Sequence, residues 1–209
     1  IVIPGREKKS ATAKKIKEQL MYSVETERLI LRPFITEDIA FLNFMHSDID
    51  VTRYTCGHTR GHNENLGFIN AMQNLYQRKL GHLLVLRKSD HLPIGRCGFS
   101  IFHGVNHPNK GWLYWDSPEM VEIEGEIVEL IELGYSFAKP YWGNGYATEA
   151  AMALRDHAYN QLGYSHFSSL IMKGNVGSVK VANNIGACDS VDCMIEGQPS
   201  LKLRNVKNG

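Results

Sequence analysis

Two glycines separated by a single residue stand between a strand-like segment and a helix-like one. Tyr141 to Ala150 read YWGNGYATEA, with the glycines at Gly143 and Gly145. Glycine permits a sharp turn and lets backbone N–H groups approach a ligand without a Cβ in the way. The first turn of a following helix adds unpaired N–H donors and the positive end of the helix dipole. The spacing therefore predicts a backbone pocket for a phosphate or pyrophosphate.

The strand-like segment before these glycines, residues 126–137, carries the carboxylates that could act on protons. Its odd positions are mostly apolar, and its even positions include the polar residues Glu126, Glu132 and Ser136, as on a sheet with one face on a core. Glu132 lies on the polar face, where it could take a proton from a substrate directly or through water. A carboxylate paired across the sheet is the alternative. Glu129 falls among the apolar positions and is a weaker candidate.

The identity of the phosphate ligand follows from what surrounds the glycines. A dinucleotide site needs a third Gly or Ala where Thr148 stands, and an acidic residue where Lys173 ends the next strand-like run. The G-x-x-x-x-G-K-[ST] loop of nucleotide triphosphatases is absent. Acyl-coenzyme A needs the same pyrophosphate pocket, and its amide-rich arm can pair with a strand edge. The sequence favours acyl-coenzyme A.

The elements that must position these residues alternate between strand and helix patterns. Residues 103–125 are predicted to be a long irregular segment, and 201–206 a last edge strand. The other predicted strands are 28–34, 82–87, 94–102, 126–137 and 166–172, and the predicted helices are 37–46, 63–79, 147–162 and 175–185. This order predicts a mixed sheet flanked by helices.

Composition limits the protein class. The chain has 209 residues, 43% hydrophobic and 22% charged, with a net charge of +1, so neither a nucleic-acid surface nor a membrane span is expected. The lysine-rich residues 1–23 predict a flexible or peripheral arm, and 24–209 a single domain. The cysteines form no CxxC pair, which favours free thiols and a cytoplasmic location.

Four segments, in the family's order along the chain, resemble the GNAT superfamily of acetyl-CoA-dependent N-acetyltransferases, and within it the RimJ/RimL type. They are Thr26 to Pro33, Ile94 to Gly98, Glu132 to Tyr135 with Tyr141 to Ala150, and Asn175 to Ser178 with Gly186. The chain departs from the pattern at Pro140, Ala182 and Ala187. Ala182 stands where many members place a tyrosine general acid.

The resemblance implies a GNAT fold, a mostly antiparallel sheet of about six to seven strands with about four helices. It implies acetyl transfer from acetyl-CoA, without a metal, to a protein N-terminal amine or a small-molecule amine by a monomer or homodimer. Its alternative is a non-catalytic acyl-CoA-binding or sensing module. Glu132 is the expected base and Ser178 a second catalytic candidate. The expected cofactor-binding residues are Tyr135, Ser136, Phe137, Trp142, Gly143, Asn144, Gly145, Tyr146, Ala147, Thr148, Asn175 and Ser178.

The residues that choose the acceptor are expected in 50–80 and 103–125, where the family pattern is least informative. The latter segment holds Trp112, Tyr114 and Trp115, which could line an acceptor cleft or merely cover the sheet. His58/His62 and His103/His107 have the i,i+4 spacing of a metal pair, but neighbouring glycines argue against a helix there, and no third ligand is evident.

Overall fold

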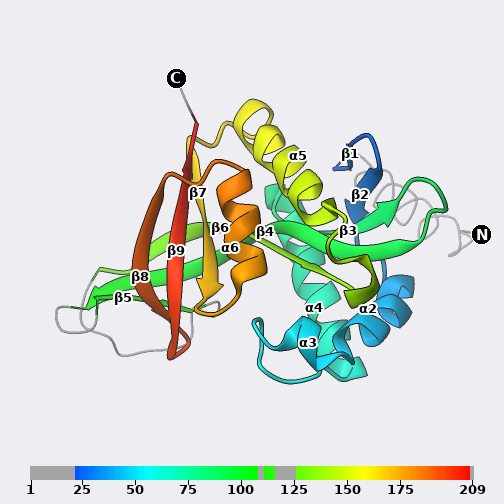
Figure 1. Ribbon diagram of the computed structural model, residues 1–209, viewed down its shortest axis with the longest axis horizontal. Coiled ribbons are helices and arrows are strands. Elements are labelled where there is room, and N and C mark those ends of the chain that lie inside the picture. Colours follow the sequence, from blue (N-terminus) through cyan, green and yellow to red (C-terminus); the bar gives the residue numbers. More distant parts are fainter. Residues whose placement is uncertain (1–21, 108–110, 116–125, 208–209) are drawn as a thin grey trace, which may run out of the picture.

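A single mixed sheet with helices on both faces forms the protein (Figure 1). The computed structural model describes residues 22–107, 111–115 and 126–207. The helices are α2 (Ile39–His46), α3 (Ile49–Thr52), α4 (His62–Leu75), α5 (Tyr146–Asn160) and α6 (Val176–Asn184), with short turns η1 (Thr36–Asp38), η2 (Tyr76–Arg78) and η3 (Lys139–Tyr141). The strands are β1 (Val24–Glu25), β2 (Leu29–Pro33), β3 (Gly81–Arg87), β4 (Pro93–His107), β5 (Gly111–Trp115), β6 (Val128–Phe137), β7 (His166–Met172), β8 (Asp189–Ile195) and β9 (Gln198–Val206).

The strand pairing is mostly antiparallel. The order is β1-β2-β3-β4-β5-β8-β9-β7-β6, and β4 also pairs with β6. Only β5–β8 and β6–β7 are parallel among the described pairs. Because β4 contacts both β5 and β6, the strands from β4 to β9 close on themselves, and β1 to β3 extend from β4 as an open sheet. The predicted fold class is confirmed, with nine strands in the described residues rather than six or seven.

Each face of the open sheet has its own core. On one face, α5 packs its fully buried alanines and Leu154 against Leu83, Phe99 and Leu133. On the other face, α2 and α4 cover Leu84 with Met45 and Ile69. Alanine lets a helix lie close to a sheet, since it adds almost no side-chain volume between them. The β6 face that carries Glu132 is the one that α4 covers.

Several element predictions were wrong. Residues 103–107 and 111–115 are the end of β4 and all of β5, which pair with each other. The rest of the predicted irregular segment, residues 108–110 and 116–125, lies outside the described residues. The last strand is not at an edge, because β9 lies between β7 and β8. α3 and β8 were not predicted.

The described residues begin at Tyr22, two residues before the first strand. β1 begins at Val24, and most of the predicted arm, residues 1–21, lies outside the described residues. Tyr22 is buried, with its ring 6.4 Å from that of Tyr76. No helix in the described part of the chain is long and apolar enough to cross a membrane.

Candidate active site

A cleft of about 1210 Å³ opens where β6 and β7 separate, and its lining comes from both strands, α4 and α6. The two strands share a single backbone pair, Glu132 with Ser168, while β6 stays paired to β4 along its whole length. The edge of β6 that faces β7 is therefore mostly free of ladder partners. A free strand edge is the feature to which an extended amide-containing chain can add.

Glu132 lies at this point of separation, with a side chain that is 7% exposed. Burial raises the pKa of its carboxyl to about 8, against the opposing effects of a hydrogen bond from the Leu170 backbone and of the Arg96 charge. A carboxylate in a low-polarity site is costly unless it is paired. This group therefore changes between acid and base near neutral pH, as a general base should.

Glu132 lies beside a cluster of polar side chains that the sequence did not predict. Strand register places His82, Arg96 and Ser100 on the face of Glu132, with Ser100 directly opposite it. Arg96 Nη1 donates to His82 Nδ1 over 2.9 Å. Because arginine can only donate, the proton of a neutral His82 must be on Nε2, which lies 3.1 Å from Ser100 Oγ. Burial, followed by the Arg96 charge, holds the pKa of His82 well below its usual value.

Gly134 leaves room for this group. A Cβ at Gly134 would lie 2.9 Å from Glu132 Oε2 and 3.0 Å from His82 Cε1. The two side chains thus approach each other over a position where only glycine avoids contact with both.

The glycine loop adopts the predicted geometry. Gly143 and Gly145 have φ of +76° and +79°, a region that side-chain-bearing residues rarely occupy. Gly145 is the residue before α5, and Glu149 N–H donates to Gly145 O at the start of the helix (3.0 Å). In the part of the chain that the structure describes, the earlier first-turn amides have no intrahelical acceptor and are available to an anion.

Side-chain hydrogen bonds from within the loop and from Arg28 hold the loop in this conformation. Trp142 Nε1 donates to Phe137 O at the end of β6 (2.6 Å), and the Asn144 amide donates to the carbonyls of Tyr141 and Trp142. Arg28 Nη1 donates to Asn144 O over 3.2 Å, and its guanidinium carbon lies 4.8 Å from the centre of the Tyr146 ring.

The α6 N-terminus lies on the other wall of the cleft. Asn175 caps it, since its side chain accepts a hydrogen bond from Ser178 N–H (3.1 Å), as the sequence predicted. Tyr135 Oη donates to Ser178 O over 2.7 Å. This bond joins β6 to α6 across the cleft. Tyr135, Asn175 and Ser178 therefore lie together in the cleft lining, whereas the loop residues 142–148, which follow the C-terminal end of β6, are not among the lining residues.

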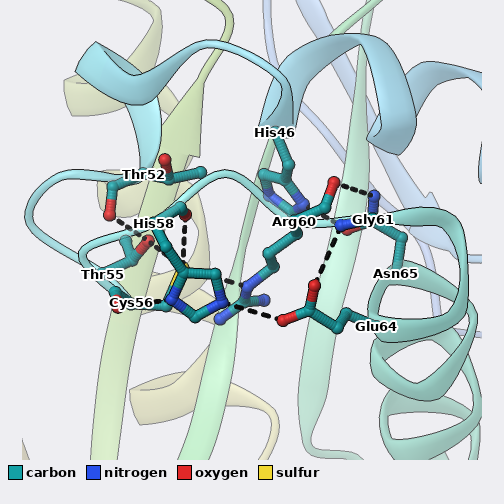
Figure 2. A network of polar contacts seen from close by, with 9 residues as sticks. All are labelled: His46, Thr52, Thr55, Cys56, His58, Arg60, Gly61, Glu64 and Asn65. Carbon is teal, nitrogen blue, oxygen red and sulfur yellow. Dashed lines mark hydrogen bonds and ion pairs between the residues drawn. The ribbon is translucent and has the colours of Figure 1, made fainter.

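The segment between α3 and α4 forms a further wall of the cleft, and a polar network fixes it (Figure 2). His58 Nε2 pairs with Glu64 Oε1 over 2.8 Å, and Glu64 Oε2 accepts from Gly61 N–H over 2.9 Å. Arg60 Nε donates to Cys56 Sγ over 3.3 Å. This segment and α4 fall within the predicted acceptor region 50–80.

Contacts show where Trp112, Tyr114 and His62 lie. Trp112 and Tyr114 stack 5.7 Å apart and pack with Cys193 and Ile195, so they cover the sheet and do not line the cleft. His62 contacts Asn43, and the described residues bring no three metal-ligating side chains together.

Comparison with known proteins gives a consistent result. Residues 28–187 match the model of a family described as an acetyltransferase (GNAT) domain. A protein of Bacillus licheniformis described as uncharacterized N-acetyltransferase p20 is 25% identical over 79% of this chain and 82% of its own length. The uncharacterized protein YkkB of Bacillus subtilis is 45% identical over 65 residues, and that match spans 31% of this chain and about a third (37%) of YkkB.

Two solved structures have the same fold at low identity. One is described as RimL, a ribosomal L7/L12 alpha-N-protein acetyltransferase, in complex with coenzyme A; its TM-score is 0.63 at 13% identity, covering 88% of this chain and 97% of that one. The other is aminoglycoside acetyltransferase AAC(6')-Ib with coenzyme A, with a TM-score of 0.62 at 13% identity, covering 86% and 95%. At such identity the likeness concerns the fold.

Proposed function

The chain belongs to the acetyltransferase (GNAT) domain family and is an acetyl-CoA-dependent N-acetyltransferase, and we propose that it acetylates a primary amine with Glu132 as the general base. The observation that carries the proposal is the buried carboxyl of Glu132, whose pKa is raised to about 8 at the point where β6 and β7 separate. Candidate acceptors are a protein N-terminal amine and a small-molecule amine.

Acetyl-CoA supplies the activated acetyl group, and the chain's part is to hold it and to manage protons. The first-turn amides after Gly143 and Gly145 suit the pyrophosphate, and the free edge of β6 suits the amide-rich arm. These features fit acetyl-CoA and require no basic side chain in the glycine loop. The N–H groups near Tyr135 to Phe137 are the proposed donors to the oxyanion.

Glu132 then acts on the acceptor. A protonated amine cannot attack a carbonyl carbon, so the base must first take its proton. A protein α-amine has a pKa of about 7.7–8.0 against about 10.4 for lysine, which makes an N-terminus the easier group to deprotonate near neutrality. The new C–N bond forms as the C–S bond breaks, and the thiolate takes a proton. Ser178 is our proposed donor, because α6 places it in the cleft lining.

Thiol release tests the proposal. The protein is mixed with acetyl-CoA and a panel of peptides and small amines, and free CoA is followed together with the mass of the acceptor. We expect an acceptor-dependent release of one CoA for each acetyl group transferred. Binding of CoA without turnover of any acceptor would contradict the proposal and favour a non-catalytic acyl-CoA-binding module.

A further inference from the structure

The charges on the acceptor side of the cleft are unevenly compensated. Its wall carries Glu64 and Glu129, and each carboxylate already has a partner. Glu64 is bound by His58 and by Gly61 N–H, and Glu129 by Arg78 over 2.9 Å. Glu64 and Glu129 are therefore already partly compensated, while Glu132 and Glu196 line the same cleft.

Arg60 and Arg96 line the same cleft, and neither forms an ion pair with any residue that the structure describes. Arg96 is 7% exposed, and its Nε is buried without a hydrogen-bond partner there. Within the described residues, its Nη1 has one hydrogen-bond partner, the neutral His82 ring. Among the described residues, the side-chain hydrogen bond of Arg60 goes to the Cys56 sulfur, which Figure 2 shows beside it.

Both guanidinium groups lie close to the Phe68 ring. Their central carbons lie 4.9 Å (Arg96) and 5.9 Å (Arg60) from the centre of the Phe68 ring. Burial, followed by the Arg60 charge, lowers the pKa of Arg96 to about 10 against the opposing effect of the Glu132 charge, which leaves Arg96 cationic at neutral pH. A buried cation such as Arg96, with a second positive charge nearby, is costly unless an anion joins them.

We propose that Arg60 and Arg96 form a subsite for an anionic group, a carboxylate or a phosphate, carried by the acceptor near its amine. This inference rests on the proposed function and adds the substrate class to it. A guanidinium binds either anion through paired charge-assisted hydrogen bonds. The same two cations repel a polycationic acceptor such as a polyamine. An amine on a peptide with an acidic side chain, or on a phosphorylated sugar, fits this charge pattern.

Matched acceptors test the inference. Peptides that differ only by Asp or Asn at the second residue, and an amino sugar with or without a phosphate, are compared by kcat/KM. We expect an advantage of about tenfold or more for the acidic member of at least one pair, as for a charge-assisted contact. The pair that shows it identifies the source of the anion. Equal values in both pairs would overturn the inference and leave the acetyltransferase proposal intact.

Variants assign the preference to the two arginines. Arg60→Gln and Arg96→Gln should each bring the acid-to-neutral ratio of kcat/KM towards one. Arg78→Gln is the matched control, because Arg78 lines the same cleft but is already paired with Glu129, and it should keep the ratio. If Arg96 serves only to balance the charge of Glu132, its variant would slow both acceptors equally and the ratio would stay, which contradicts the subsite.

A binding measurement covers the case of no turnover. The N-acetylated Asp and Asn peptides are titrated into the CoA complex, with the Arg60→Gln protein alongside. Tighter binding of the Asp peptide that the variant loses supports the subsite. Equal binding of the two peptides would overturn it, whatever the activity.

Discussion

The acid–base behaviour of Glu132 follows from competition between burial and a few neighbours. Burial favours the protonated form, while the Leu170 hydrogen bond and the Arg96 charge favour the carboxylate. Burial has the larger effect, and the pKa rises to about 8. Without Arg96 the pKa of Glu132 would be higher still, and a smaller fraction of it would be ionised and able to accept a proton at neutral pH. Arg96 thus has a role towards the base as well as its proposed role towards the acceptor.

The raised pKa predicts a pH-dependent contribution of Glu132 to stability. The folded state holds the Glu132 proton more tightly than the unfolded state does, so this contribution is fully present below pH 4.5 and is lost as pH rises through about 8. One pKa unit corresponds to about 1.4 kcal/mol, which predicts a loss of several kcal/mol. Urea unfolding of the wild type and Glu132→Gln at about pH 5 and pH 9 should show the free-energy difference shifting in favour of the variant. A constant difference would contradict the raised pKa.

Alanine substitutions at two glycines on the Glu132 face of the sheet should have different effects, one on activity and the other on stability. A Cβ at Gly134 meets only side-chain ends, those of Glu132 and His82, whereas a Cβ at Gly98 would lie 2.2 Å from the backbone Cα of His82. We expect Gly134→Ala to keep most of the stability and lose most of kcat. Gly98→Ala should chiefly destabilise the fold, because backbone cannot move aside as side-chain ends can. Thermal unfolding and steady-state kinetics of both variants check this, and a fully active Gly134→Ala would contradict the crowded site.

At the scale of elements, the glycine loop is held by the opening strand. Glu149, in the first turn of α5, accepts hydrogen bonds from Thr26 Oγ1 (2.5 Å) and Arg28 N–H (2.9 Å) and pairs with the Arg28 guanidinium. Arg28 also bonds the carbonyl of Asn144. The Thr26 to Pro33 segment therefore serves the site indirectly, by fixing the start of the helix that is proposed to bind the pyrophosphate.

Alanine substitutions at two left-handed glycines should separate binding from strain. Gly143 and Gly163 have φ of +76° and +75°, and a Cβ would meet nothing within 4 Å at either. Each change should cost about 1–2 kcal/mol of stability through the left-handed backbone. Only Gly143→Ala should also weaken acetyl-CoA binding, measured by calorimetry, because Gly163 follows the far end of α5. An equal effect of both variants on binding would contradict the assignment of the loop.

Local patterns predicted the elements that local chemistry determines. Gly143, Gly145 and the alanine face of α5 indicated a turn followed by a helix, and Asn175 indicated a cap, because each signal lies within a few residues of its effect. β5 was missed because Pro108 and Gly111 read as loop, while its partners in β8 are about eighty residues away.

The same limit applies to the site. Alternation along β6 was enough to identify Glu132. His82 and Arg96 join it only through the register of β3 with β4 and β4 with β6, which no local pattern contains. The available signal for His82 was a histidine followed by a run of apolar residues. Arg96 lay in Ile94 to Gly98, a segment that carries the family resemblance, but no role was assigned to it.

For the whole molecule, the separation of β6 from β7 leaves two parts of the sheet joined by few contacts at the cleft. They are bridged there by the Tyr135–Ser178 bond, the Glu132–Ser168 pair, the Leu170 backbone hydrogen bond to Glu132 and a bond from Ser169 Oγ to Leu133 O (2.9 Å). A ligand that occupies the edge of β6 adds contacts to both sides, so it should stabilise the fold.

This predicts a CoA-dependent rise in unfolding temperature. At a CoA concentration about 100 times Kd, binding adds about 2.7 kcal/mol to the free energy of unfolding, a shift that scanning calorimetry resolves. The Gly143→Ala protein should need more CoA for the same shift, and Gly163→Ala should not. A wild-type transition that does not move with CoA would contradict the binding site.

The pH dependence of kcat/KM tests the central claim most directly, since it reports the free enzyme. With an acceptor whose amine pKa is known, the wild type should lose activity as pH falls below about 8, because Glu132 becomes protonated. Glu132→Gln should be slower by about 100-fold or more at pH 7 and retain only the limb that belongs to the acceptor amine. A variant with the wild-type profile and rate would contradict Glu132 as the base.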